Sequence, residues 1–234
     1  MAVEPPEMEK QKTMKLFIVP TPIGNLEDIT LRGLRILKEV ALIFCEDTRT
    51  TKNLLKHYGI EKKCYAYHIN NEHKQVEQYV SWLQNGQTAA LVSDAGTPGI
   101  SDPGYLFIRE CLAKGIEIEC LPGATALIPA LVASGFPCDK FYFHGFLPHK
   151  KGKETTLKML SERKETVVFY ESPHRLLKTL PMMLNIFEPE RKICVSREIS
   201  KMYEEHFRGT IQEAVSHFFA KEVKGEIAVS IEGK

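Results

Sequence analysis

Residues 88–104 read TAALVSDAGTPGISDPG, and this stretch indicates which kind of fold the chain forms. Its first six residues are a short, mostly apolar run that predicts a buried strand. The eleven residues from 94 to 104 include three glycines and two prolines, and a helical pattern begins at Tyr105. A buried strand, a glycine-rich turn and a helix in this order are typical of an open α/β sheet, which binds ligands beyond the carboxyl ends of its strands.

The same alternation continues on both sides of this stretch. Further strands are predicted at 16–20, 41–45, 64–69 and 116–121, and helices at 30–40, 48–58, 72–84 and 105–114. Five strands joined by helices favour a mostly parallel sheet that is covered on both faces. Beyond Pro122 the pattern restarts, with strands at 141–143, 166–170, 192–196 and 226–231 and helices at 155–163, 175–187 and 211–221. The fold class is therefore α/β with two lobes, the second of them a mixed α/β lobe.

The domain organisation follows from these segments. We expect a flexible tail at 1–13, an N-terminal lobe at 14–121 and a C-terminal lobe at 138–234. Between the lobes, residues 122–137 contain the run ATALIPALVASG, which predicts a linker with a helix of small residues.

Composition excludes several classes of protein. The chain has 234 residues, 43% of them hydrophobic and 26% charged, with a net charge of +1, which is ordinary for a globular protein. No apolar run approaches the roughly 20 residues of a membrane-spanning helix. The six cysteines show neither disulfide nor zinc-site spacing, so we expect free thiols in the reducing cytoplasm and no metal site. The dinucleotide motif G-x-G-x-x-G, the Walker lysine loop, G-x-S-x-G and H-E-x-x-H are all missing from the sequence.

Polar and turn-forming residues collect directly after four of the predicted strands. These segments are PTPIGN at 20–25, EDTR at 46–49, the loop at 94–104 and PGAT at 122–125. Strand-to-helix loops are often rich in such residues for turn and capping reasons alone. Four of them at one edge of a sheet nevertheless favour a ligand site. In the longest loop, Asp94 could bind ligand hydroxyls or balance a cation, while Asp102 could either bind ligand or cap the following helix.

Six blocks of the sequence carry a family resemblance. In chain order they are VPTPIGNLEDIT, EDTR, LVSDAGTPGISDPG, LPGATALIPAL, FYESPHRL and SRE, and the match runs from about Leu16 to the C-terminus. The chain resembles the tetrapyrrole-methylase superfamily, and within it the RsmI-type enzymes that methylate a cytidine 2′-hydroxyl of 16S ribosomal RNA in the small subunit. This resemblance implies S-adenosyl-L-methionine as the cofactor, a ligand cleft between the two lobes, and a homodimer.

The resemblance also implies which residues bind the cofactor. The glycine-containing loop would contribute Asp94, Gly96 and Thr97, with Asp102 close by. The turn after the first strand would line the same crevice, and the Pro-Gly-x-Thr segment and a strand of the second lobe would complete it. The members of these three groups are Pro22, Ile23 and Gly24; Thr125 and Ala126; and Tyr170.

Methyl transfer to a ribose hydroxyl requires in-line alignment and is helped by a general base. The catalytic candidates are Asp94, Glu171 and His174, with Glu46, Asp47 and Glu198 as further carboxylates; His174 could equally begin a helix. The candidates for RNA contact are cationic: Arg49, Lys150, Lys151, Lys153, Arg175 and Arg197. The EDTR block could instead be an internal ion-pair network, and the lysines could be a solvated surface loop.

Two other functions remain open at this point. The protein could methylate a tetrapyrrole or another small molecule with the same cofactor. It could also be a non-catalytic RNA-binding or ribosome-assembly factor that retains the cofactor pocket.

Overall fold

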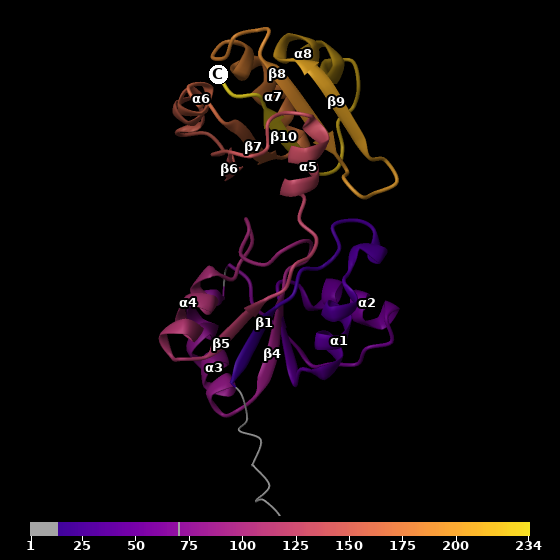
Figure 1. The fold of residues 1–234 in the computed structure, drawn as a ribbon, viewed down its shortest axis with the longest axis vertical. Helices are drawn as coiled ribbons and strands as arrows, with labels where there is room; N and C mark the ends of the chain where they lie inside the picture. The colour runs from indigo at the N-terminus through magenta and orange to yellow at the C-terminus, as the bar shows by residue number, and fades with distance from the viewer. Residues whose placement is uncertain (1–13, 70) are drawn as a thin grey trace, which may run out of the picture. The chain divides into compact units, whose positions relative to one another are not determined.

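The structure is a computed structural model that describes residues 14–69 and 71–234; the tail expected at 1–13 lies outside these residues. The chain divides into two compact units (Figure 1). The first comprises Met1–Thr21 and Ile29–Gly123, and the second comprises Pro22–Asp28 and Ala124–Lys234. The chain therefore passes from one unit to the other three times. In the described residues, no helix is long and apolar enough to cross a membrane.

The first unit is built on a five-stranded sheet with the order β3-β2-β4-β1-β5. The strands are β1 (Lys15–Ile18), β2 (Leu42–Cys45), β3 (Cys64–Ala66), β4 (Thr88–Val92) and β5 (Glu117–Cys120). All four strand pairings are parallel. The helices are α1 (Leu31–Glu39), α2 (Thr48–His57), α3 (Glu72–Gln84) and α4 (Tyr105–Ala113). The expected parallel sheet is confirmed.

The helices cover this sheet on both faces because neighbouring strand residues point to opposite sides. Ile43 packs in a buried cluster with residues of α1 and α2, whereas Phe44 packs with α3 and α4. Figure 1 shows α1 and α2 on one side of the sheet and α3 and α4 on the other. Both faces are thus apolar, so the polar positions of this unit lie at the ends of the strands.

The second unit contains a mixed sheet with the order β6-β7-β10-β8-β9. Its strands are β6 (Phe141–Phe146), β7 (Thr166–Glu171), β8 (Lys192–Arg197), β9 (Glu205–Thr210) and β10 (Ile227–Ile231). Only β6 and β7 pair in parallel; the other three pairings are antiparallel. Its helices are α5 (Leu127–Ser134), α6 (Lys153–Ser161), α7 (Pro173–Leu184) and α8 (Ile211–Phe219), and a 3-10 turn, η1, spans Leu26–Asp28.

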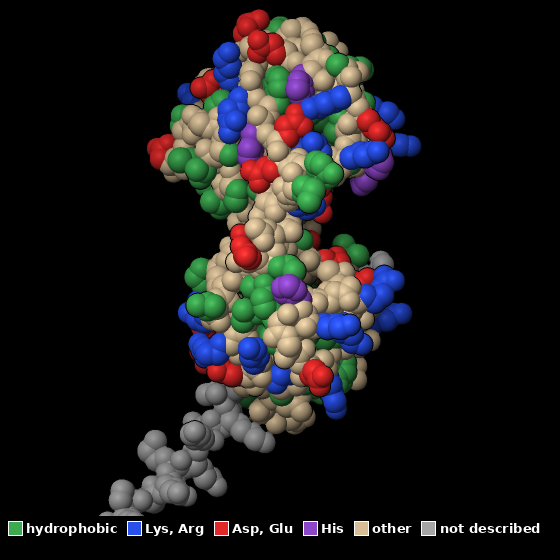
Figure 2. Space-filling view, turned by 90° about the vertical axis from the view of Figure 1, so that its right-hand side faces the viewer, with side chains coloured by type: hydrophobic (Ala, Val, Ile, Leu, Met, Phe, Trp, Pro, Cys, Tyr) green, Lys and Arg blue, Asp and Glu red, His purple; other side chains and the backbone are tan. Residues whose placement is uncertain are grey.

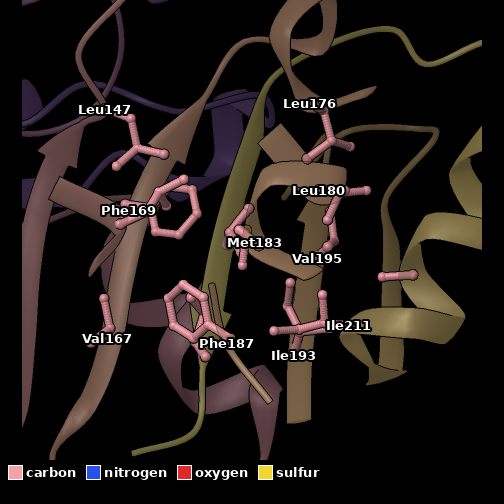
Figure 3. Packing of buried hydrophobic residues seen from close by; sticks show 14 of the residues in the cluster. Leu147, Val167, Phe169, Leu176, Leu180, Met183, Phe187, Ile193, Val195 and Ile211 are labelled. Carbon is pink, nitrogen blue, oxygen red and sulfur yellow. The ribbon is translucent and has the colours of Figure 1, made fainter. Parts of the chain in front are cut away.

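The core of the second unit lies between this sheet and its helices. Leu180 and Met183 of α7 are fully buried and belong to the same cluster as Phe169 of β7 and Val195 of β8 (Figure 3). The helix of small residues that we expected in the linker is α5, and it belongs to this unit, where it contacts β10 and β8. Its small side chains allow this close approach: Ala130 is fully buried, and its carbonyl accepts a hydrogen bond from Ser230 Oγ at 3.3 Å.

Strand β9 is absent from the sequence-based prediction. Its sequence, EHFRGT, has a single apolar residue and therefore lacks the pattern of a buried strand. It forms because it pairs along its whole length with β8, at the edge of the sheet. Its polar side chains add to this pairing, since the ring of His206 contacts Ser196 Oγ at 2.8 Å and Glu205 accepts from Arg197 Nε at 3.1 Å.

Candidate active site

The loops that follow β1 and β4 are joined to each other at the carboxyl edge of the first sheet. Thr21 and Gly96 exchange two backbone hydrogen bonds, each of 2.9 Å. Thr21 Oγ1 donates to the carbonyl of Ser93 at 3.0 Å, and Ser93 Oγ donates to the carbonyl of Gly96 at 3.2 Å. Because β4 lies between β1 and β2, the loop after β2 emerges beside these two. The loops after β2 and β4 and the first residues after β1 therefore meet at this edge, whereas residues 22–25 and 124–125 of the expected segments belong to the second unit.

Three carboxylates gather at this edge. Asp94 accepts a hydrogen bond from the backbone N–H of Asp47 at 3.1 Å. Burial raises the pKa of Asp94, and burial together with the nearby Asp94 charge raises the pKa of Glu46. The Arg49 guanidinium binds both oxygens of Asp47, at 2.6 and 3.1 Å, and holds the pKa of Asp47 down to about 2. The cluster retains excess negative charge and is therefore suited to a cationic ligand.

The long loop between β4 and α4 has an unusual backbone. Gly96, Gly99 and Gly104 all have positive φ, with values of 81°, 84° and 147°. A Cβ on Gly104 would also lie 3.3 Å from the backbone nitrogen of Gly99, which is a tight contact. Gly104 itself precedes the first residue of α4, and this helix has no side-chain cap. Gly104 has no side chain with which to cap the helix, and the capping role of Asp102 stays a prediction.

The segment Pro22–Asp28 packs within the second unit against the turn between β8 and β9. A Cβ on Gly24 would meet Lys201 Cγ at 2.3 Å and the carbonyl oxygen of Ser200 at 3.0 Å. Ser200 Oγ donates a hydrogen bond to the carboxylate of Asp28. The side chain of Ile23 is buried. The predicted cofactor turn is thus held in place by residues almost 180 positions away in the sequence.

The turn at 198–204, which we call the β8–β9 turn, is itself strained and braced. Glu198 and Ser200 have positive φ values of 53° and 66°, which is uncommon for residues other than glycine. Glu198 Oε1 accepts from Lys201 Nζ and from the backbone N–H of Glu226, both at 2.9 Å. Glu204 accepts from the backbone N–H of Ser200 at 2.6 Å. Glu198 therefore has structural partners, which argues against its being a general base.

Strain of this kind clusters at functional sites, and no residue pattern in the sequence predicts it. The SRE block contains Glu198, but positive φ at a glutamate and a serine leaves no compositional signal. The partners of the turn, Lys201 and Glu204, were not predicted as functional residues either. The glycine at position 24 is compatible with a tight contact, but the sequence does not indicate which segment makes that contact.

Glu171 proves to be the centre of a buried ion-pair network, which corrects two predictions. Its side chain is 0% exposed and that of Lys153 is 6% exposed, and Lys153 Nζ lies 2.9 Å from Glu171 Oε2. Thr179 Oγ1 and the backbone N–H of Ser172 also donate to this carboxylate, at 2.6 and 2.9 Å. Glu171 is thus saturated with donors and does not serve as a general base. Lys153 does not present its amine to RNA.

Arg175 belongs to the same network, so its predicted RNA contact is corrected as well. Its Nη2 lies 2.7 Å from Glu171 Oε1, and its Nη1 donates to the carbonyl of Leu147 at 3.0 Å. The side chain is 16% exposed and directed to these internal partners. Arg197 is similarly engaged, with Glu205 at 3.1 Å and the carbonyl of Lys224 at 3.3 Å.

The remaining candidates lie at the surface or beside the cluster. His174, Lys150 and Lys151 are exposed, and the Arg49 side chain is 88% exposed although it is paired with Asp47. Of the cysteines, Cys45, Cys111 and Cys194 are buried while Cys120 and Cys138 are exposed, and all six are free. On the face shown in Figure 2, basic and acidic side chains are interspersed on both units. Among residues 14–69 and 71–234, no group of three or more His, Cys, Asp or Glu side chains could hold a metal ion.

Two predicted cofactor contacts precede α5, and one lies at the end of β7. Thr125 and Ala126 are half-buried, and the carbonyl of Ala126 accepts the N–H of Ala130 in the first turn of α5. Tyr170 is half-buried and makes edge-on ring contacts with Phe143 and Phe146, at centroid distances of 5.1 and 5.5 Å. All three residues belong to the second unit, as does the Pro22–Asp28 segment.

Solved structures define the class of protein to which this fold belongs. Cobalt precorrin-4 methyltransferase, a cobalamin biosynthetic enzyme, matches with a TM-score of 0.69 and 16% identity over 97% of this chain and 98% of that chain. Uroporphyrin-III-C-methyltransferase from Thermus thermophilus matches with a TM-score of 0.65 and 18% identity over 93% of this chain and 94% of that chain. The fold is that of the tetrapyrrole methyltransferases, as the resemblance implied.

Sequence comparison then gives the family. The model of the Tetrapyrrole (Corrin/Porphyrin) Methylases matches residues 15–215, and the chain belongs to this family. Three curated relatives carry the name "Ribosomal RNA small subunit methyltransferase I". The protein of Thermotoga maritima is 48% identical over 94% of this chain and 99% of its own length. Those of Pseudomonas aeruginosa and Bacillus subtilis are 49% and 45% identical, over 81% and 93% of this chain and 67% and 75% of their own lengths.

Proposed function

We propose that the protein transfers a methyl group from S-adenosyl-L-methionine to the 2′-hydroxyl of a cytidine in the ribosomal RNA of the small subunit. The observation that carries this proposal is the 45–49% identity to relatives named for small-subunit ribosomal RNA methylation, over most of this chain. The tetrapyrrole methyltransferases are below 20% identical, so they support the fold and not a tetrapyrrole substrate.

The residues of the first unit fit such a cofactor. When bound, S-adenosyl-L-methionine supplies an electrophilic methyl group on a positively charged sulfur. The excess negative charge of Glu46, Asp47 and Asp94 would stabilise a cationic ligand at the carboxyl edge of the sheet. Asp94 keeps a second carboxylate oxygen for ligand hydroxyls or an ammonium group, since only Oδ1 accepts from Asp47. We assign Gly96, Thr97 and Asp102 to the same binding surface.

The residues of the second unit would bind the rest of the cofactor. We assign this role to the turn Pro22, Ile23 and Gly24, to Thr125 and Ala126, and to Tyr170. The turn suits a rigid contact because the β8–β9 turn fixes Gly24 and Asp28. A preorganised contact loses little conformational freedom when the ligand binds.

Asp94 and His174 are our preferred candidates for the general base that activates the ribose hydroxyl, and Glu46, whose pKa is also raised by burial, stays a further one. Asp94 has a pKa raised by burial, which makes its carboxylate a better proton acceptor than an ordinary one. His174 is exposed at the start of α7 and has an imidazole of suitable chemistry. For RNA contact we retain the exposed cations Arg49, Lys150 and Lys151.

The experiment is incubation of the purified protein with labelled cofactor and small ribosomal subunits that lack methylation at the target nucleotide. We expect label in the small-subunit RNA and 2′-O-methylcytidine after nuclease digestion. Label that stays out of RNA, on free RNA as well as on assembled subunits, would overturn the proposal. Cofactor binding by calorimetry without any turnover would instead indicate a non-catalytic assembly factor.

We further propose that the enzyme works as a homodimer in the cytoplasm. Light scattering of the eluting peak in size-exclusion chromatography measures the first point. Immunoblotting of cell fractions measures the second.

A further inference from the structure

Phe146, the last residue of β6, is an aromatic side chain that the core does not use. Phe146 is 54% exposed, although it ends a regular strand and the next residue, Leu147, is buried. Its ring meets that of Tyr170 at a centroid distance of 5.5 Å and an interplanar angle of 61°, and Tyr170 meets Phe143 at 5.1 Å and 70°. Edge-on pairs of this kind are favourable, so Tyr170 supports the Phe146 ring from one side.

The backbone of β6 sets this exposure. Phe143 pairs with Val168 and Phe146 pairs with Tyr170, so three steps along β6 correspond to two steps along β7. An extra residue in one strand is a bulge, which redirects the side chains beyond it. Gly145 lies within this irregularity and has a φ of 74°, which glycine adopts without strain. The bulge in β6 therefore explains why the Phe146 side chain is exposed.

The segment after Phe146 is fixed at both ends by the network around Glu171. The carbonyl of Leu147 accepts from Arg175, and Lys153 binds Glu171 at the start of α6. Both cations pair with the same buried carboxylate, at 2.7 and 2.9 Å. One buried acid thus determines where the segment from Leu147 to Lys153 begins and ends.

Three side chains of this braced segment are basic or ionisable and lie in solvent. His149, Lys150 and Lys151 are exposed and follow Phe146 in the sequence after Leu147 and Pro148. Proteins that bind unpaired nucleotides combine such cations, which contact phosphates, with aromatic rings on which bases stack. This region of the protein contains both parts: an exposed aromatic ring, which a second ring contacts, and a basic segment that follows it in the sequence.

We propose that Phe146, supported by Tyr170, is a stacking platform for one unpaired base of the RNA substrate, and that Lys150 and Lys151 contact the adjoining phosphates. This inference rests on the proposed function and names residues of this chain that would hold its substrate. RNA is favoured over the adenine of the cofactor because the exposed lysines that follow the ring in the sequence match a chain of phosphates, whereas the cofactor has no phosphate.

The test compares Phe146→Ala with Phe219→Ala. Phe219 is 57% exposed at the end of α8, so the control removes a ring of equal exposure from a place with no proposed role. We expect Phe146→Ala to raise the KM for small subunits or the Kd for a short cytidine-containing RNA by roughly 5- to 100-fold. Phe146→Trp should restore both values, and the Kd for the cofactor should stay within about twofold of wild type in every variant.

Two outcomes would overturn the inference while wild-type RNA methylation persists. One is equal behaviour of the Ala variants at 146 and 219. The other is a loss of cofactor affinity in Phe146→Ala, which would assign the ring to the adenine. If the wild-type protein methylates no RNA, the proposed function itself fails, and the variants are then compared by RNA binding alone. Matching thermal unfolding curves exclude a folding defect in the variants.

A second readout isolates the cations. The double variant Lys150→Ala/Lys151→Ala should reduce the slope of log K against log salt concentration by about 1.4, since each phosphate contact on a single strand contributes about 0.7. The double variant Lys178→Ala/Lys192→Ala, which removes two exposed lysines elsewhere in the unit, should leave the slope unchanged. Equal slopes in all proteins would contradict the phosphate contacts.

Discussion

At the scale of single residues, Glu171 shows how a carboxylate at the end of a strand can be structural. It pairs with Lys153 and Arg175 and accepts hydrogen bonds from Thr179 and the backbone of Ser172, while its side chain is inaccessible to solvent. Sequence position alone places it beside the proposed cofactor contact at Tyr170, which is why it was a candidate base. The burial of the Glu171 carboxylate among its donors makes it a structural residue, and the local sequence pattern does not predict this burial.

We predict that Glu171→Gln destabilises the protein by about 3–5 kcal/mol, because it leaves two buried cations without their counter-charge. Urea unfolding followed by circular dichroism measures the free energy of unfolding. Glu154→Gln is the matched control, since Glu154 pairs with Lys158 on the exposed face of α6 and should leave the unfolding midpoint unchanged. Equal midpoints for the two variants would contradict the network's importance.

Asp94→Asn tests the acidic cluster at the same scale. The amide oxygen can still accept the N–H of Asp47, so the loop keeps its contact while the negative charge is lost. We expect the cofactor Kd to rise about tenfold or more, since hydrogen bonds to a charged group are roughly twice as strong as neutral ones. Calorimetry gives the value, with the exposed Asp139→Asn as control. An unchanged Kd would remove Asp94 from the binding surface.

At the scale of elements, the β8–β9 turn positions the turn that we assign to the cofactor. Ser200→Ala removes the donor to Asp28 without adding bulk. We predict a roughly threefold to tenfold weaker cofactor, as expected for the loss of one charge-assisted hydrogen bond near the surface. Ser216→Ala is the control, because its hydroxyl donates to a carbonyl within α8, at 3.3 Å. If both variants bind the cofactor as wild type does, the turn is only structural.

Glu205, the first residue of β9, joins this strand to β8 and to the region of α8. Burial opposes its ionisation, but Lys221, His217 and Arg197 outweigh burial and lower the pKa of Glu205 to about 2. A carboxyl whose pKa is lower in the folded state contributes stability above its unfolded pKa of about 4.3, and this is lost as pH falls toward 2. We predict that wild type loses about 2 kcal/mol more than Glu205→Gln between pH 6 and pH 2.5. Parallel urea-unfolding titrations of the two proteins would show the difference, and identical pH profiles would contradict it.

Elements were predictable where their pattern is apolar and local. All eight helices of the described chain lie close to their expected positions, because their apolar spacing and caps, such as Thr30 and the Thr210–Glu213 capping box, are readable from neighbouring residues. Strand β9 was not predicted, since its stability comes from pairing with β8 and from contacts such as His206 with Ser196. Non-local pairing of this kind has no signature within the segment itself.

At the scale of the whole molecule, the proposed cofactor contacts are distributed over both units. The loop at 94–104 belongs to the first, and Pro22–Asp28 and Tyr170 belong to the second. We predict that the cofactor slows amide hydrogen exchange both at 94–104 and at 22–28, because ligand binding suppresses local opening of the segments that it contacts. Mass spectrometry of peptic fragments measures both segments in one experiment. Protection confined to one unit would contradict a shared binding surface.

The same distribution limits what the sequence can predict about the site. The residues after β1, β2 and β4 could be grouped in advance, because parallel strands end at one edge. The assignment of Pro22–Asp28 to the second unit could not, since it depends on Ser200 and Lys201, far along the chain.

The three passages of the chain between its units matter for anyone recombining this protein with a relative. A hybrid gene joined at residue 124 would combine Gly24 and Asp28 from one parent with Ser200 and Lys201 from the other. The fit at Gly24 leaves no room for even a methyl group, so the two stretches should be inherited together. Crossovers between residues 28 and 200, which separate them, should yield fewer active hybrids than crossovers within α8, which leave both stretches with one parent.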